Sequence, residues 1–213
     1  MAPFRPLLIY AFDAYCGWCY GFTPWLRRAV ADRPHLAVEV VSGGLFTGSR
    51  RVPIRELRHI PTARHRVTAH TGAVFGPAFL TLLEQGDFVM DSEDAAAGLA
   101  GLRDLAPAKV LDLASAMSYA FYHDGRGLSD PDTYRAIAEQ YDLDGDTAAA
   151  ALTDPVRHQQ ARREFTQSRI LGVESYPTLL LDTGSGPRIL DVTHTAPSQI
   201  GEHLDSILAT VPL

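Results

Sequence analysis

Lysine and cysteine are scarce in this chain, and long hydrophobic runs are absent. Of its 213 residues, Lys109 is the one lysine and only two are cysteines. Two cysteines are too few for a disulfide-rich scaffold or a four-thiolate zinc site. No stretch approaches the roughly 18 consecutive apolar residues that a membrane-spanning helix needs. We therefore expect no metal and no membrane partner.

Net positive charge is also absent. The formal net charge is -6, which argues against a nucleic-acid partner. Hydrophobic residues make up 46% and charged residues 21%, as in ordinary folded proteins. The first apolar run, residues 7–12, is shorter than the core of a secretory signal, so we expect the protein in the cytoplasm.

Arginine carries nearly all of the positive charge, and part of it is clustered. A charge run usually forms a solvated face, and an anion-binding role is the alternative interpretation. Only Glu56 offsets the cluster. Its members are Arg50, Arg51, Arg55, Arg58, Arg64 and Arg66.

The first 50 residues read as strand, helix and strand. Residues 7–12 form an apolar run typical of a strand buried on both faces. A helix pattern follows Cys16, contains Pro24 near its start, and ends at Arg33-Pro34. Residues 36–41 are rich in valine and predict a second strand, which Ser42-Gly43-Gly44 ends.

The pattern of residues 53–154 predicts helices separated by glycine and proline. Predicted helices cover residues 61–71 and 77–85, each followed by glycine, and a helix capped at Asp91-Ser92 runs to residue 105. Three more are predicted: residues 107–123, residues 131–141 after an Asp130 cap, and a short one from an Asp146 cap to about residue 152.

The last 60 residues return to mixed structure. A helix over 155–172 precedes a strand over 176–181, a partner strand over 188–192 and a final helix from about residue 196. The order predicts an α/β fold, with a mixed four-stranded sheet and helices on both faces. We expect residues 1–50 and 154–213 to form this domain, and 51–153 to form an inserted all-helical subdomain.

Cys16-Gly17-Trp18-Cys19 lies between the first strand and the first helix. Free N–H groups and the helix dipole at that position favour a thiolate on Cys16. Cys19, about one turn further, is spaced to attack a mixed disulfide on Cys16. We expect Cys16 to attack and Cys19 to resolve, with a presented, reactive sulfur at Cys16.

Three other interpretations of the cysteine pair are open. A structural staple across so short a loop would contribute only about 2 kcal/mol. Half a zinc site would need two further ligands, and no histidine pair shows a recognisable zinc spacing. Two inert core thiols would make the position at the helix start a coincidence.

Residues near the pair supply weaker candidates. Tyr15 and Trp18 could form an apolar rim that docks a substrate peptide. Asp13 could oppose the thiolate, although a strand-end carboxylate facing water is the favoured interpretation. His194 could lie near the site, with a surface histidine favoured.

Around this pair the sequence resembles the thioredoxin superfamily. The resemblance identifies Cys16 to Cys19 with the active-site motif, and Pro24 with the helix-kinking proline that follows it. Pro177 resembles the cis-proline that faces the disulfide, next to a backbone that holds substrate. Tyr176 is bulkier than the residue usual before that proline.

The helical insertion narrows the resemblance to the DsbA-like branch. Within it, the segments FDAYCGWCYG and SGGLF look like the cytoplasmic, FrnE-like predicted disulfide isomerases. Gly17-Trp18 differs from the proline-histidine pair of the strongly oxidising periplasmic enzyme, so that redox poise is not carried over.

The leading functional prediction is a thiol–disulfide oxidoreductase that acts on protein or peptide disulfides, with glutathione a possible partner and no cofactor. The resemblance implies Tyr15, Trp18, Tyr176 and Pro177 as substrate-binding residues. A glutathione-dependent isomerase or transferase of the kappa-class type is the alternative, and a non-enzymatic binding module is a third. The sequence leaves the direction of exchange, the substrate and the oligomeric state open.

Overall fold

A four-stranded sheet at the centre of the chain carries helices on both faces. The computed structural model describes residues 5–190, 192 and 195–209. The strands run in the order β2-β1-β3-β4. β1 pairs parallel with β2 and antiparallel with β3, and β3 pairs antiparallel with β4. The strands are β1 (Leu7–Phe12), β2 (Ala37–Ser42), β3 (Thr178–Asp182) and β4 (Pro187–Ile189).

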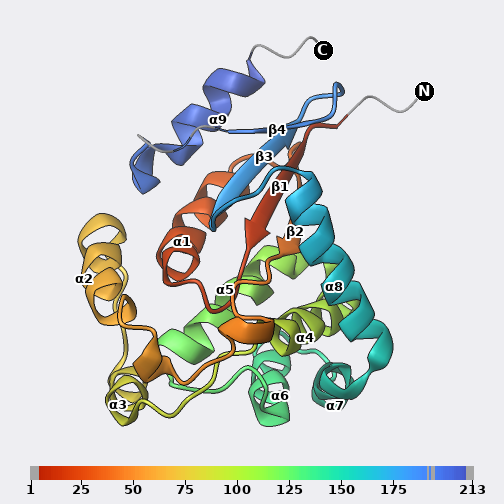
Figure 1. The fold of residues 1–213 in the computed structure, drawn as a ribbon. Helices are drawn as coiled ribbons and strands as arrows, with labels where there is room; N and C mark the ends of the chain where they lie inside the picture. The colour runs from red at the N-terminus through yellow and green to blue at the C-terminus, as the bar shows by residue number, and fades with distance from the viewer. Residues whose placement is uncertain (1–4, 191, 193–194, 210–213) are drawn as a thin grey trace.

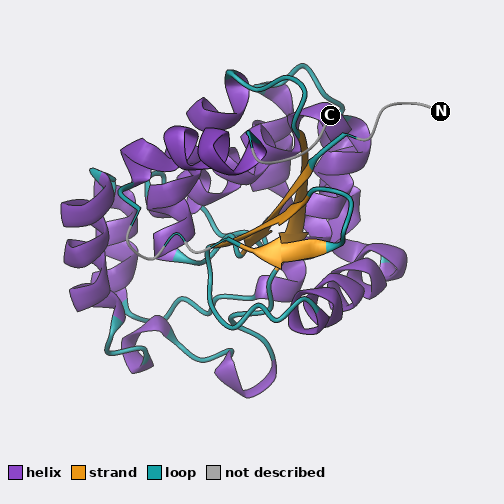
Figure 2. Cartoon of the chain, turned by 90° about the horizontal axis from the view of Figure 1, so that it is seen from above, coloured by secondary structure: helices purple, strands orange, loops and turns teal. Residues whose placement is uncertain are grey.

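Both faces of β1 are buried, as its unbroken apolar run predicted. Tyr10 and Phe12 pack with α1 (Gly17–Ala31) in the larger core. Ile9 and Ala11 point to the opposite face and pack with Leu180 of β3 in a second cluster. Alternation along a strand sends neighbouring side chains to opposite faces, so the sheet needs helices on both sides, as Figure 2 shows.

The segment between β2 and the long helix α8 (Pro155–Ile170) is helical, and α3 to α7 gather beyond the carboxyl end of β1 (Figure 1). α9 (Ile200–Leu208) packs against α1. The helices of this segment are α2 (Ile60–Thr71), α3 (Pro77–Gln85), α4 (Ser92–Leu105), α5 (Val110–Tyr122), α6 (Pro131–Glu139) and α7 (Gly145–Ala150).

Local end signals account for most helix boundaries. Asp91 caps α4 by accepting hydrogen bonds from the backbone N–H groups of Glu93 and Asp94, and Asp130 caps α6 in the same way. α2 ends at Gly72, whose φ of 75° is left-handed and suits glycine. These boundaries agree with the prediction.

Three predicted elements were wrong in detail. The cap of α7 is Asp144, which accepts from the N–H of Thr147, whereas Asp146 lies in the first turn and pairs with Arg135. The helix predicted over 107–123 is a 3-10 turn, Pro107–Lys109, followed by α5. The last strand was predicted over residues 188–192, whereas β4 ends at Ile189. Residue 191 of the predicted strand lies outside the described residues.

Within the described residues, no helix combines the length and apolar character needed to cross a membrane.

Candidate active site

Cys16 is the N-cap residue of α1. Its backbone N–H donates to the carbonyl of Asp13 at 2.9 Å, which closes the turn after β1. Its own sulfur accepts a hydrogen bond from the backbone N–H of Cys19, with an N to Sγ distance of 3.4 Å. In other cap residues an oxygen satisfies this free N–H of the first helical turn, and here a sulfur does. The strand-to-helix turn therefore places the sulfur at the positive end of the helix dipole.

The sulfur of Cys16 is less exposed than the sequence predicted. Only 5% of the residue is accessible. Its thiol donates to the carbonyl of Tyr176 at 3.2 Å, across 160 positions of sequence. The segment just before β3 therefore covers the sulfur from one side. Tyr176 and Pro177 are joined by a cis peptide bond, as the resemblance implied.

Cys19 is fully buried beneath Cys16, and both cysteines are free thiols in this structure. Burial, together with the hydrogen bond and charge of Cys16, raises the pKa of the Cys19 thiol well above its ordinary value. Cys19 is thus held as a neutral thiol one helical turn behind Cys16.

Asp13 does not face water. The residue is 2% exposed, and its carboxylate accepts hydrogen bonds from the backbone N–H groups of Tyr15 at 3.0 Å and Leu45 at 2.9 Å. Burial raises its pKa to about 6, against the lowering effect of these hydrogen bonds. The sequence signal for this role was the Asp-x-Tyr spacing of an Asx turn, while the contact to Leu45 depends on the tertiary fold.

Tyr15 is part of the core rather than an exposed rim. It is 1% exposed, and its ring meets that of Phe121 edge-on at 4.7 Å between centroids. Its hydroxyl accepts from the backbone N–H of Leu128 at 2.9 Å. Its carbonyl accepts from the hydroxyl of Tyr122 at 2.5 Å. Tyr15 therefore ties the turn before Cys16 to α5 and to the turn at Leu128.

Two hydroxyl groups of α5 hold the peptides that lead into Cys16. Tyr122 binds the carbonyl of Tyr15, and Ser118, one turn earlier on the same helix, donates to the carbonyl of Ala14 at 3.3 Å. Their i,i+4 spacing puts both side chains on one face of α5. Neither residue was predicted from the sequence, because neither lies near a recognisable motif.

Trp18 is half-buried at the mouth of the site. The guanidinium of Arg66 lies 5.8 Å from the centroid of its ring, and the His70 ring meets it at 6.0 Å. An open groove next to Trp18 is lined by α2, Tyr176 and Pro177. Trp18, Tyr176 and Pro177 thus border one groove.

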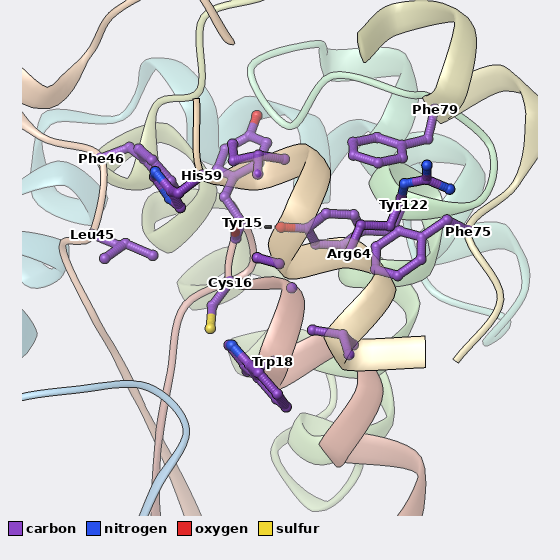
Figure 3. Close-up of a pocket in the computed structure, with 14 residues that line it drawn as sticks. Tyr15, Cys16, Trp18, Leu45, Phe46, His59, Arg64, Phe75, Phe79 and Tyr122 are labelled. Carbon is purple, nitrogen blue, oxygen red and sulfur yellow. Dashed lines mark hydrogen bonds between the residues drawn. The ribbon is translucent and has the colours of Figure 1, made fainter. Parts of the chain in front are cut away.

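A smaller, mainly apolar cavity of about 130 Å³ also borders Trp18 and includes Cys16 in its wall. Figure 3 shows that its lining comes from the turn at Cys16, from the 45–46 loop, and from α2, α3 and α5. The labelled residues of this wall are Tyr15, Cys16, Trp18, Leu45, Phe46, His59, Arg64, Phe75, Phe79 and Tyr122.

The SGGLF loop after β2 closes this region. A Cβ at Gly43 would overlap the ring of Tyr176, so glycine permits the close approach of the two segments. Asp13 and Ser92 bind the backbone N–H groups of Leu45 and Phe46 and hold the rest of the loop in place.

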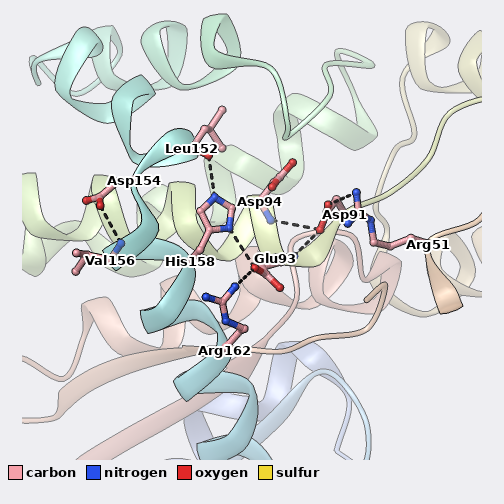
Figure 4. A network of polar contacts seen from close by, with 9 residues as sticks. All are labelled: Arg51, Asp91, Glu93, Asp94, Leu152, Asp154, Val156, His158 and Arg162. Carbon is pink, nitrogen blue, oxygen red and sulfur yellow. Dashed lines mark hydrogen bonds and ion pairs between the residues drawn. The ribbon is translucent and has the colours of Figure 1, made fainter. Parts of the chain in front are cut away.

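A polar network anchors α4, the helix that supplies Ser92 (Figure 4). Glu93 pairs with Arg162 of α8 and lies 3.2 Å from the Nδ1 of His158. Asp91 pairs with Arg51 at 2.6 Å. Arg51 therefore forms an ion pair at the start of α4, and its charge is already paired within the protein.

In the part of the chain that the structure describes, no group of three or more histidine, cysteine or acidic residues is placed to share an ion. His194 lies outside the described residues.

Comparison with known families decides the class of the chain. A model of the DSBA-like thioredoxin domain matches residues 8–191. The chain belongs to the DSBA-like thioredoxin family. It is therefore an enzyme of the thiol–disulfide oxidoreductase class, as predicted.

Solved structures of this family share the fold. The cytosolic disulfide reductase DsbM from Pseudomonas aeruginosa has 24% identity and a TM-score of 0.82, with 95% of this chain and 98% of that chain covered. A candidate protein disulfide isomerase from Nitrosomonas europaea has 21% identity and a TM-score of 0.83, with coverage of 98% and 100%. A probable DsbA oxidoreductase from Streptomyces coelicolor has 18% identity and a TM-score of 0.69, with coverage of 98% and 93%. No protein with a curated description matches the chain.

Proposed function

We propose that this DSBA-like protein exchanges protein or peptide disulfides through Cys16 and Cys19. The thiolate of Cys16 attacks one sulfur of the substrate disulfide, forms a mixed disulfide and releases the first substrate thiolate. Cys19 then loses its proton and attacks the sulfur of Cys16, which releases the second thiolate. The substrate gains two electrons, and the Cys16–Cys19 pair becomes a disulfide. The reverse sequence oxidises a dithiol.

The observation that carries this proposal is the position of the Cys16 sulfur. It lies at the start of α1, 3.2 Å from the carbonyl of Tyr176, and in the wall of a cavity. A staple or an inert core thiol needs neither the helix start nor a cavity. The raised pKa of Cys19 supports its assignment as the resolving thiol, because a neutral thiol does not compete with Cys16 for the first attack.

The groove next to Trp18 is the proposed position of the substrate. We assign the groove bordered by Trp18, Tyr176 and Pro177 to the substrate chain. Tyr15 contacts no substrate in this proposal, and it holds the turn before Cys16 through its carbonyl and hydroxyl.

The proposal also includes glutathione as a redox partner and the cytoplasm as the location of the protein. One solved structure of the Pseudomonas aeruginosa disulfide reductase is described as cytosolic and as containing GSH, and it has 24% identity to this chain. We propose glutathione as a redox partner here. The presence of two cysteines favours this role over kappa-class transfer, in which glutathione is activated without a resolving thiol.

The test is single-turnover reduction of a small disulfide by the reduced protein. Cys16→Ser abolishes the reaction, and Cys19→Ser accumulates a mixed disulfide that mass spectrometry detects at Cys16. A Cys16→Ser variant that keeps the wild-type rate contradicts the proposal. A Cys16→Ser variant that still consumes glutathione in transfer to an electrophile indicates the kappa-class reaction instead.

A further inference from the structure

The cavity beside Cys16 has apolar walls and a cation in its lining. Its apolar lining includes Trp18, Leu45, Phe46, Phe75 and Phe79, and Arg64 of α2 supplies a positive charge. In Figure 3 the Cys16 sulfur and the Arg64 guanidinium lie on opposite sides of the Tyr122 ring. Because Cys16 and Arg64 line the same cavity, a group bonded to the sulfur can extend past this ring through apolar space toward a positive charge.

Arg64 is incompletely satisfied where it lies. Its Nη2 is 3.2 Å from the Nε2 of the exposed His65. Its Nε is buried and has no hydrogen-bond partner. A buried guanidinium nitrogen without a partner costs free energy, which an incoming acceptor recovers. Carboxylates fit the fork of guanidinium donors best.

The rest of the arginine cluster is engaged elsewhere or lies away from this cavity. Arg51 pairs with Asp91, and Arg55 with Asp87. Arg50 binds the carbonyl of Gly44. Arg66 faces the outer groove beside Trp18. Of the salt bridges found in the described part of the chain, none includes Arg64, so its charge is available to a ligand.

We propose that Arg64 is a carboxylate subsite for the glutathione half of a mixed disulfide. The proposal rests on the thiol chemistry proposed above and specifies its substrate. A cavity of about 130 Å³ is smaller than the roughly 300 Å³ of ordinary ligand pockets, so it suits a small arm of a tripeptide rather than a polypeptide segment.

The chemical step follows from this placement. Cys16 attacks the glutathione sulfur, the substrate thiolate leaves, and Cys16 becomes bonded to glutathione. Cys19 then attacks the Cys16 sulfur and releases glutathione as a thiolate. The mixed disulfide gains two electrons and the cysteine pair loses two.

The experiment compares two disulfides in single turnover. The reduced full-length protein is mixed with oxidised glutathione or with the neutral hydroxyethyl disulfide, and formation of the Cys16–Cys19 disulfide is followed by acid quench and mass spectrometry. Arg64→Gln lowers the ratio of the two rate constants, glutathione to hydroxyethyl, about tenfold, the size expected for one lost hydrogen bond to a charged group. Arg58→Gln, at an exposed arginine outside the cavity, is the matched control and leaves the ratio unchanged.

A third substrate distinguishes the source of the carboxylate. Short peptides joined by a disulfide, with a glutamate beside each cysteine, are compared with the same peptides carrying glutamine. Dependence on Arg64 for the acidic peptides without dependence for glutathione overturns the assignment to glutathione. An unchanged ratio in Arg64→Gln, or an equal loss for both small disulfides, overturns the subsite. A wild-type protein that reduces neither small disulfide contradicts the proposed function itself.

Discussion

Asp13 makes the stability of this protein depend on pH. The carboxylate is 2% exposed and joins the turn before Cys16 to the loop at Leu45. Its pKa in the folded protein is about 6, against an ordinary value of 3.8, because burial disfavours the charged form. The folded protein therefore holds this proton more tightly than the unfolded chain does.

The sign and size of the effect follow from this difference. The stability that Asp13 contributes is fully present below about pH 3.8, the unfolded value, and is lost as the pH rises through about 6. A difference of about two pH units corresponds to about 3 kcal/mol in the free energy of unfolding. About 2 kcal/mol of this loss falls between about pH 4.5 and 7.5, where folding can be measured.

The perturbation is Asp13→Asn, which keeps the shape and removes the titration. The free energy of unfolding of each protein is measured by urea denaturation across this pH range. We expect the wild-type value minus the variant value to fall by about 2 kcal/mol from the acid to the neutral end. Asp132→Asn, at a side chain that is 80% exposed, controls for the loss of one negative charge.

A constant difference, or one that increases with pH, refutes the reasoning. An increase would mean that the hydrogen bonds from Tyr15 and Leu45 stabilise the carboxylate more than burial destabilises it. The folded pKa would then lie below the ordinary value.

Two further predictions concern Tyr122 of α5 and His158 of α8. Tyr122→Phe keeps the ring but leaves the buried carbonyl of Tyr15 without its donor; we expect a loss of about 1–3 kcal/mol in urea denaturation. It also slows attack by Cys16 because the turn loses an anchor, and a wild-type rate would contradict this. Although burial opposes it, hydrogen bonds to the Leu152 carbonyl and to Glu93 raise the pKa of His158. Its stabilising contribution is therefore full below about pH 6.5 and decreases at higher pH, and His158→Gln should remove that part of the pH dependence of thermal unfolding.

The described structure agrees with the sequence at most places where a local pattern was sufficient, and the cap of α7 is an exception. The apolar run of β1, the cysteine pair at the start of α1 and the Asp91 cap each depend on residues within a few positions of one another. Strand alternation, helix capping and glycine at helix ends act over one or two turns, so they can be read without knowing the fold. The cis bond before Pro177 was implied by resemblance alone.

Only the tertiary structure decided how the cysteine pair is surrounded. The sequence predicted a solvated carboxylate at Asp13, but the loop at Leu45 covers it. It predicted an exposed rim at Tyr15, but the ring packs against Phe121. Tyr122 reaches Tyr15 across 107 positions of sequence. The sequence does not distinguish Arg64 from the other five clustered arginines, and its position in the wall of the Cys16 cavity follows only from the fold. Burial and partner identity depend on segments far away in the chain, and these set the electrostatics that a local pattern does not contain.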